Sequence, residues 1–375
     1  MKTVGIISEY NPFHDGHAYH IRQAKAETGA DYAVVIMNGD FVQRGEPAIF
    51  NKYIRTEQAL DGGADIVFEL PVRFGLSSAG DFAFGGIKAL ESLGFIDSVC
   101  FGSEAGCLTP FLEAADILVR EPKAFGTNLR SFLRRGMSFP AARTHALSEI
   151  SGMSVEFMQT PNNILALEYC ISLQRLSSSI QPFTIRRIGQ DYHGENSDCG
   201  FPSASALRRN IAKSKKPHLT LEDFSSVIGY ALLSNPDLTR CKDISSDLSE
   251  RIAKFLPNYQ SATALIRKCS NHSITKGRIR RALLQCLLHI EKTNKTMPYL
   301  RLLGMKKEAS SLLSQREDTS CQILTRLAAD CRELNPQALA LLKQDLFASD
   351  LYRQIYCQKY GQRLPNEYQH SPLIR

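Results

Sequence analysis

The sequence lacks several features that mark common classes of protein. It contains no tryptophan and no run of about 18 apolar residues, the length that a membrane-spanning helix needs. Its ten cysteines are scattered singly, without CxxC pairs or the Cys/His spacings of zinc sites, and it has neither internal repeats nor low-complexity tracts. The N-terminus, Met1-Lys2-Thr3-Val4, enters a predicted strand directly, unlike a signal peptide. We therefore expect a soluble cytoplasmic protein with free thiols, no membrane association, no protein-bound metal and no obligate protein partner.

Charge is distributed unevenly along the 375 residues. Residues 1–212 have 19 Lys and Arg against 23 Asp and Glu, a net charge of −4. Residues 213–375 have 26 against 15, a net charge of +11. Because Lys and Arg that neutralise phosphates drive nucleic-acid binding, the second half is predicted to bind a polyanion. The alternative is a basic helical surface that is simply solvated.

Apolar segments alternate with helical patterns through the first half. Strands are predicted at Val4–Ile7, Tyr32–Met37, Ile66–Leu70, Ser98–Phe101 and Phe183–Ile188. Helices are predicted between them near His17–Thr28, Lys52–Gly62, Ala79–Gly94, Pro140–Glu149 and Asn163–Leu176. This alternation predicts an α/β fold with a Rossmann-like parallel sheet covered on both faces. Ligands then bind at the carboxyl ends of the strands, where the strand order reverses.

The pattern changes after Lys213-Ser214-Lys215-Lys216-Pro217. Helical spacing without clear strand signals is found at Leu219–Leu233, Asp247–Phe255, Ile279–His289 and Ala338–Phe347. The sequence therefore predicts a parallel-sheet domain over residues 1–212, followed by an all-α basic domain over residues 213–375.

The most informative segment follows the first predicted strand and reads Asn11-Pro12-Phe13-His14-Asp15-Gly16-His17. Its HxGH pattern is typical of nucleotidyltransferase-like folds, which bind ATP at the α-phosphate. Gly16 lacks a Cβ, so a phosphate can approach the N-terminus of the following helix, where free N–H groups favour an anion. Imidazolium groups of His14 and His17 would then stabilise the charge that develops as diphosphate leaves. The alternative is two surface histidines near a turn.

A second phosphate site is predicted where Ser205 and Arg208 open a helix after the last strand. A hydroxyl and a guanidinium at a helix N-terminus can hold the β- and γ-phosphates and the leaving diphosphate. Alternatively, this segment holds only a helix cap and a solvated arginine.

Three other loops follow predicted strands or begin a helix. The loop that contains Asp40, Gln43 and Arg44 is long for a βα connection, which favours a lid or a contact to a substrate carboxylate. Gly102 would let an adenine or ribose pack against the backbone. Asn162 and Asn163 begin a helix, where capping accounts for one and the other can reach the nucleotide.

A dense basic stretch, Thr275-Lys276-Gly277-Arg278-Ile279-Arg280-Arg281, enters a helix in the second half. Lys276, Arg278, Arg280 and Arg281 can follow a phosphate backbone, as expected of a tRNA-binding surface. A solvated helix face is the competing interpretation.

These segments together resemble the bacterial tRNA(Met) cytidine acetate ligase family, which carries the HxGH signature. The matching segments span most of the chain in order and are Gly5–His17, Phe41–Pro47, Phe101–Glu104, Asn162–Leu165, Arg186–Gly189 and Thr275–Ile279. The Phe41–Pro47 stretch is far more specific than HxGH. The chain departs from the family at Asn38-Gly39-Asp40, where Ser-Gly-Asn is usual.

The resemblance implies an enzyme that activates acetate with ATP to acetyl-adenylate. The acetyl group is then transferred to N4 of the wobble cytidine (C34) of elongator tRNA(Met), which yields N4-acetylcytidine, AMP and diphosphate. Mg²⁺ is expected to arrive with the ATP. The resemblance places ATP contacts on Ile7, Ser8, Glu9, Tyr10, Asn11, Pro12, Phe13, His14, Asp15, Gly16, His17, Gly102, Arg187 and one of Asn162 or Asn163, for which we choose Asn162.

Two other functions are compatible with parts of the sequence. An HxGH ligase or nucleotidyltransferase acting on a small molecule, as in pantothenate-synthetase-like chemistry, would need no half with a net charge of +11. An RNA-binding or regulatory protein with a degenerate nucleotide fold would not need His14, Gly16, His17 and Arg208 all intact. Salt-sensitive tRNA binding distinguishes the first from a tRNA enzyme, and ATP consumption with tRNA and acetate distinguishes the second.

Overall fold

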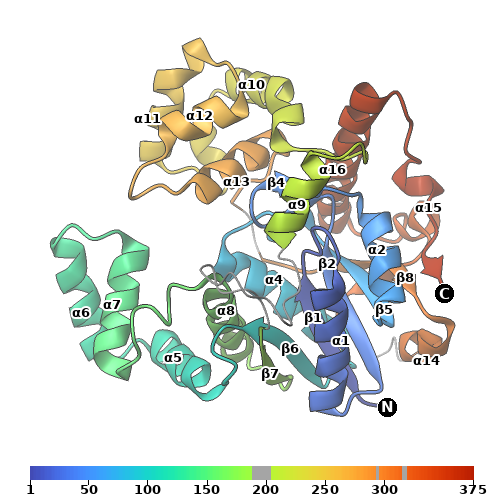
Figure 1. The fold of residues 1–375 in the computed structure, drawn as a ribbon, viewed down its shortest axis with the longest axis horizontal. Coiled ribbons are helices and arrows are strands. Elements are labelled where there is room, and N and C mark those ends of the chain that lie inside the picture. The colour runs from blue at the N-terminus through green and yellow to red at the C-terminus, as the bar shows by residue number, and fades with distance from the viewer. Residues whose placement is uncertain (188–203, 293–294, 315–318) are drawn as a thin grey trace.

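One mostly parallel sheet organises the molecule (Figure 1), whose computed structural model describes residues 1–187, 204–292, 295–314 and 319–375. The strand order is β10-β8-β5-β2-β1-β6-β7, with β9 beside β8. The strands are β1 (Thr3–Ser8), β2 (Tyr32–Asn38), β5 (Ile66–Leu70), β6 (Ser98–Ser103), β7 (Gln181–Arg186), β8 (Tyr299–Met305), β9 (Gln322–Leu324) and β10 (Leu373–Ile374). Strands β5, β2, β1, β6 and β7 are parallel to one another, whereas β8 runs antiparallel to β5.

Helices follow the strands of the first half. They are α1 (Asp15–Thr28), α2 (Lys52–Asp61), α3 (Val72–Gly75), α4 (Ala79–Ser92), α5 (Thr109–Arg120), α6 (Lys123–Arg134), α7 (Phe139–Ser151) and α8 (Pro161–Arg175). Local sequence sets their ends: the Asn51 side chain accepts from the Ile54 N–H to begin α2, and Gly29, with φ of 62°, ends α1. Between β2 and α2, the short strands β3 (Phe41–Val42) and β4 (Glu46–Pro47) pair as a hairpin.

The remaining helices are α9 (Ala204–Ala212), α10 (Ser225–Ser234), α11 (Ser246–Phe255), α12 (Ala262–Cys269), α13 (Lys276–Leu287), α14 (Ser310–Leu313), α15 (Leu327–Asp330) and α16 (Pro336–Tyr360). Helices α10 to α13 form a separate group at the upper left of Figure 1. Their apolar faces share one core, to which α16 contributes Tyr352 and the β3–β4 hairpin contributes Phe41. The helical segment is therefore packed onto the first half of the chain.

Alternating side chains of the central strands belong to two other hydrophobic cores, one on each face of the sheet. In β2, Val34 and Ile36 belong to the core formed with α4, α5 and α8, whereas Val35 and Met37 belong to the core formed with α1 and α2. Successive strand residues point to opposite faces, so a sheet covered on both faces requires the nearly continuous apolar runs seen in the sequence.

The predicted α/β fold class, with a Rossmann-like parallel sheet followed by a basic helical region, is confirmed. The five predicted strands are present, although Ile188, predicted to end the last one, lies outside the described residues. After residue 213, however, the expectation of helices alone holds only as far as α13. Residues 299–374 return to the sheet as β8, β9 and β10, because the apolar strand β8 completes the edge that β5 would otherwise expose.

Four charged side chains are buried where this C-terminal return meets α2. The Lys52 Nζ lies 2.8 Å from a carboxylate oxygen of Glu69 and 2.8 Å from one of Glu367. Arg301 of β8 lies opposite Glu69 of β5 in the sheet register and also pairs with Glu367. Burial alone would raise the pKa of Glu367, but Lys52 and Arg301 lower it to about 2. The two cations and two carboxylates therefore compensate one another in an interior that would not tolerate any of them alone.

We predict that Lys52→Met destabilises the protein by about 3–5 kcal/mol, because it leaves two buried carboxylates with one cation. The free energy of unfolding from urea titration measures this loss. Lys88→Met is the matched control: Lys88 pairs with Glu91 at 3.1 Å on a partly exposed helix face, where the expected change is below about 1 kcal/mol. Equal losses in the two variants would contradict the compensating role of the buried cluster.

Candidate functional site

The strand order reverses between β1 and β6. These neighbours pair in parallel, while β2 continues the sheet on one side and β7 on the other. The chain leaves β1 into α1 on one face and leaves β6 into α5 on the other, which opens a crevice at the carboxyl ends of both strands. The segment Glu9–His17, Glu104 and Arg187 all follow strands that end at this edge. The edge is therefore where a ligand is expected.

The loop between β1 and α1 is held rigidly from several directions. Tyr10 is buried and has φ of 45°, a left-handed backbone conformation that is uncommon outside glycine. The Asn11 side chain accepts a hydrogen bond from the Ile49 N–H at 2.7 Å, and Arg208 donates to the Asn11 carbonyl oxygen at 2.7 Å. The structure thus brings the predicted second phosphate site, on α9, against the HxGH loop.

The two HxGH histidines stack on each other at the start of α1. Their ring centroids lie 3.8 Å apart with an interplanar angle of 25°. His14 caps the helix, because its Nδ1 accepts the Gly16 N–H at 3.1 Å. The neutral His14 ring therefore carries its proton on Nε2, which leaves that N–H free to donate to a ligand. His17 Nδ1 is buried and has no hydrogen-bond partner among the described residues.

Burial lowers the pKa of both histidines, that of His17 well below its usual value, and the positive charge of Arg187 adds to the effect. Both imidazoles are therefore neutral at neutral pH in the protein alone. The expectation of imidazolium donors concerns the state with ATP bound and stays a prediction. A bound phosphate would supply the negative charge that could restore a proton to either ring.

A third histidine extends this row and was missed from sequence. His20 lies one turn after His17 on α1, with its Nε2 3.9 Å from the Sγ of buried Cys100. Burial, followed by the charge of Arg187, lowers its pKa to about 4. The spacing of His14, His17 and His20 at i, i+3 and i+6 could have indicated a shared helix face.

Arginines surround the HxGH loop. Arg44, at the tip of the β3–β4 hairpin, lies with its Nε 3.5 Å from a Glu9 oxygen and keeps 52% of its side chain exposed. Arg208 also donates to the Ser205 hydroxyl at 3.0 Å, which joins the two residues predicted to act together. Burial lowers the pKa of Arg187 and Arg208, and the positive charge of Arg44 lowers both further. Arg44 thus lies close enough to repel each of the other two guanidiniums, which favours a polyanionic ligand.

The structure separates the roles of Asn162 and Asn163. Asn163 is buried, and its Oδ1 accepts the backbone N–H groups of Glu104 and Ala105 while its Nδ2 donates to the Phe157 carbonyl. Asn162 is half-buried, and its Nδ2 donates to Glu104 at 2.6 Å. Asn163 thus shapes the loop after β6, and Asn162 has an amide oxygen left for a ligand.

Gly102 lies beneath an arginine. A Cβ at this position would lie 3.1 Å from the Cγ of Arg187, so the glycine lets the arginine stem cross the end of β6 closely. Arg187 also lines a groove of about 520 Å³, whose other lining residues are Tyr19, Gln23, Glu27, Gly106, Thr184, Ile185 and Arg186. This groove between α1 and β7 is contiguous with the histidine row through Arg187 and provides room for a small ligand.

The residues predicted as a lid or acetate contact do not all face the site. Asp40 is buried, and its carboxylate accepts the Lys52 N–H at 2.9 Å, so it caps α2. Phe41 and Val42 are buried in the hairpin, whereas Gln43 is partly exposed beside Arg44. The long connection is thus a packed hairpin, and Arg44 is the charged side chain that it presents to the HxGH loop.

The predicted basic stretch starts α13 and lies against the same hairpin. Arg280 pairs with Glu46 at 2.6 Å, and Arg281 pairs with Asp243 at 2.8 Å. Arg278 donates to the Asp243 carbonyl oxygen at 3.2 Å, and Lys276 is exposed. The stretch therefore leaves fewer free cations than its sequence suggests.

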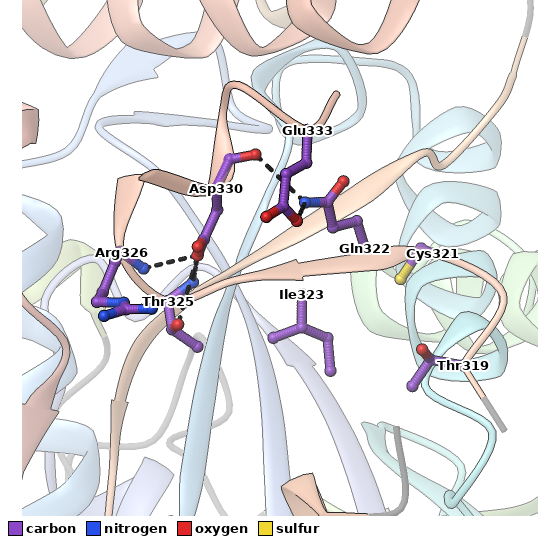
Figure 2. Close-up of a pocket in the computed structure, with 8 residues that line it drawn as sticks. All are labelled: Thr319, Cys321, Gln322, Ile323, Thr325, Arg326, Asp330 and Glu333. Carbon is purple, nitrogen blue, oxygen red and sulfur yellow. Dashed lines mark hydrogen bonds between the residues drawn. The ribbon is translucent and has the colours of Figure 1, made fainter. Parts of the chain in front are cut away.

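A second hollow, of about 270 Å³, lies beside β9 and α15 (Figure 2), with three strands of the sheet between β9 and β1. Its polar groups bind one another: the Asp330 carboxylate accepts the N–H groups of Thr325 and Arg326, both at 2.7 Å. These contacts stabilise a turn. Within the described ranges, no group of three or more His, Cys, Asp or Glu side chains is placed to hold a metal ion.

Comparisons with known proteins agree along the whole chain. A family described as HIGH Nucleotidyl Transferase matches residues 1–220 and 212–367. Proteins called tRNA(Met) cytidine acetate ligase are similar to it: the one from Thermoanaerobacter sp. (strain X514) is 36% identical, over 95% of this chain and 96% of that protein. The one from Caldicellulosiruptor bescii is 36% identical, over 100% of this chain and 98% of that protein. The crystal structure of Thermotoga maritima TmcAL bound with alpha-thio ATP superposes with a TM-score of 0.89 at 28% identity, over 100% and 99% of the two chains.

The buried neutral histidines predict how stability depends on pH. The folded-state pKa of His20, about 4, lies below its ordinary value of 6.5, so the unfolded chain holds one more proton between these values. The free energy of unfolding should therefore decrease as pH falls from about 6.5 to 4, by about 1.4 kcal/mol per pH unit for each such histidine. In urea titrations across this range, His20→Gln should show a shallower decrease. The same pH slope in the variant and the parent would contradict the assignment.

Proposed function

Since the chain belongs to the tRNA(Met) cytidine acetate ligase family of HIGH nucleotidyl transferases, we propose that it acetylates the wobble cytidine (C34) of elongator tRNA(Met) at N4 in an ATP-dependent reaction. The observation that carries the proposal is the neutral pair His14 and His17, set at the strand-order reversal and surrounded by Arg44, Arg187 and Arg208. Donors and cations in this arrangement suit a nucleoside triphosphate at its α-phosphate. No helix of the described residues is long and apolar enough to cross a membrane.

The reaction proceeds in two steps. An acetate oxygen attacks the α-phosphorus of ATP, the bond to the β-phosphate oxygen breaks, and diphosphate leaves with the bonding electron pair. The N4 amine of the cytidine then attacks the carbonyl carbon of acetyl-adenylate, AMP leaves, and N4 loses a proton. Both steps take place in the cytoplasm, where the tRNA, ATP and acetate are present together.

The chain's own residues position and stabilise the first step. The free Nε2–H of His14 and the unpartnered nitrogen of His17 contact the α-phosphate oxygens, where negative charge develops. Ser205 and Arg208 hold the diphosphate end, and Arg187 with Asn162 contacts the nucleoside side. Glu9 to Phe13, Asp15 and Gly16 form the surrounding wall, with Ile7, Ser8 and Gly102 at the strand ends. Mg²⁺ enters with the ATP phosphates, whose charge it neutralises.

Arg44 is the residue we assign to acetate, because its guanidinium is exposed beside the HxGH loop and can bind a carboxylate with two hydrogen bonds. The neighbouring cations of α13 contribute to tRNA binding. Lys276 and Arg278 lie at the outer end of this helix, while Arg280 and Arg281 combine that role with holding α13 in place. The tRNA would then approach the site from the side of the β3–β4 hairpin.

Nucleoside mass spectrometry tests the proposed function directly. Bulk tRNA incubated with the protein, ATP and labelled acetate should yield labelled N4-acetylcytidine, together with AMP and diphosphate. Omission of ATP is the control and should abolish the label. Formation of acetyl-adenylate without any acetylated nucleoside would instead favour a small-molecule ligase.

We predict that His17→Ala lowers turnover of the adenylylation step by on the order of a hundredfold, with modest loss of ATP affinity, because its contact strengthens in the transition state. Acetate-dependent exchange of labelled diphosphate into ATP measures this step. His272→Ala, at an exposed histidine outside the site, is the control. Unchanged exchange in His17→Ala would remove His17 from the catalytic residues.

A second prediction separates two adjacent arginines of α9. Arg208→Ala should raise the ATP concentration for half-maximal exchange about tenfold, because a charge-assisted contact to phosphate is lost. Arg209→Ala removes the same charge from an exposed position on the same helix and should leave the ATP requirement near that of the parent. If the two variants behave alike, Arg208 has only a structural role at Asn11.

A further inference from the structure

The helices α6 and α7 form a hairpin that projects away from the sheet. They lie at the left of Figure 1, below the α10–α13 group, and Arg143 of α7 pairs with Glu168 of α8. Phe125 and Phe132 of α6 and Ala142 and Ala146 of α7 are buried in the core that covers one face of the sheet. The pair therefore has one face in the core and one exposed face.

The hairpin is strongly basic within an acidic half of the chain. Residues 123–151, which span both helices, contain five Lys and Arg and one acidic residue, Glu149, although residues 1–212 as a whole have a net charge of −4. Lys123, Arg130 and Arg134 are exposed and form no ion pair with any described residue. Since Glu149, the carboxylate of the hairpin, pairs with none of them among the described residues, these cations produce a positive potential over its surface.

The other two cations of the hairpin have structural contacts. Arg143 pairs with Glu168 of α8 at 2.8 Å, and the Arg135 guanidinium lies 5.2 Å from the centre of the Phe132 ring. The Arg143 contact also relates the hairpin to the candidate site, because the first turn of α8 contains Asn162 and Asn163. The hairpin is thus connected to the site through one rigid helix.

The hairpin also has an exposed aromatic side chain close in sequence to its cations. Phe139, the first residue of α7, is 59% exposed, and Leu133 near the end of α6 is 38% exposed. The turn that joins the helices places Phe139 close in sequence to Arg134 and Arg135. Exposed aromatic rings flanked by cations are the combination that binds unpaired bases by stacking while the cations bind the adjacent phosphates.

The α6–α7 hairpin offers more free cations than the stretch predicted from sequence. In α13, Arg280 and Arg281 are paired with Glu46 and Asp243, whereas Lys123, Arg130 and Arg134 have no such partners among the residues described. The charge totals of the two halves conceal this difference, because they average the hairpin with the acidic sheet domain.

We propose that the α6–α7 hairpin is an RNA-binding arm, in which Lys123, Arg130 and Arg134 contact phosphates and Phe139 stacks on an unpaired base. The identity of the RNA as a tRNA rests on the proposed function, whose target base lies in a loop with other unpaired bases beside it. The arm would bind one part of the tRNA while α13 binds another.

The experiment compares two triple variants of the full chain with equal loss of charge. Lys123→Gln/Arg130→Gln/Arg134→Gln removes the arm cations while keeping side chains that favour helix. Lys307→Gln/Arg332→Gln/Lys343→Gln removes three exposed cations from the C-terminal region. For the arm variant, tRNA affinity at about 0.1 M salt should fall tenfold to a hundredfold, and the slope of log affinity against log salt should flatten by roughly two to three. The control variant should bind nearly as the parent does.

The stacking contact is tested separately. Phe139→Ala should weaken tRNA binding about fivefold or more without changing the salt slope, because a base loses its stacking partner and no phosphate contact is lost. Phe139→Trp should restore binding, since any exposed ring can stack. Equal affinity of Phe139→Ala and Phe139→Trp would overturn the stacking role, and equal losses in the two triple variants would overturn the arm.

Two further readouts keep this test apart from that of the proposed function. Acetate-dependent diphosphate exchange should be the same in the arm variant and the parent, because the arm does not touch the nucleotide site. If the arm variant loses exchange as much as it loses tRNA binding, the arm does not act on RNA binding alone and the proposal is wrong. If the parent acetylates tRNA and the arm variant binds tRNA equally well, the arm is wrong and the function stands. If the parent binds tRNA through the arm but forms no acetylcytidine, the arm stands and the proposed function is wrong.

Discussion

The compensation of four buried charges determines how the whole chain is assembled. Lys52 from α2, Glu69 from β5, Arg301 from β8 and Glu367 near the C-terminus come from segments far apart in sequence. The two cations keep Glu367 ionised, whereas burial still raises the pKa of Glu69 to about 7. The cluster therefore fixes the C-terminal segment against the parallel sheet. It also orients α2, whose N-terminus is capped by Asp40 at the base of the β3–β4 hairpin. The position of Arg44 beside Glu9 depends on that hairpin and hence on the cluster.

At the nucleotide site the balance of charge is the opposite. Burial and the charge of Arg44 lower the pKa of both Arg187 and Arg208, and burial lowers the pKa of His14 and His17. The carboxylates nearby, Glu9, Glu46 and Glu104, are each engaged by a guanidinium or an asparagine. The region thus tolerates an excess of cationic groups that a triphosphate would relieve, and the binding of such a ligand would couple to proton uptake by the imidazoles.

The sequence predicted those segments whose local residue pattern matches the environment in which they lie in the folded protein. Strands β1, β2 and β5 are apolar on both faces, so their apolar runs identify them as buried strands. The HxGH spacing directly after β1 identified His14 and His17. Strand β8 was missed because its run is interrupted by Arg301, a charge that only distant partners make acceptable. Strands β9 and β10 are too short to show any period. The separate roles of Asn162 and Asn163 could not be predicted either, since they depend on how the loop after β6 turns.

The antiparallel strand β8 has a consequence for the order in which the protein can be completed during synthesis. Residues 1–187 can form the parallel strands as they leave the ribosome, but β5 then remains an unprotected edge, and Glu69 has Lys52 beside it but not Arg301. That edge is covered only when residues 299–305 emerge, and the last partner of Lys52 lies within ten residues of the C-terminus. A nascent chain therefore exposes an unpaired edge strand until β8 has been made. Premature termination before β8 would leave a fragment that tends to pair with other chains.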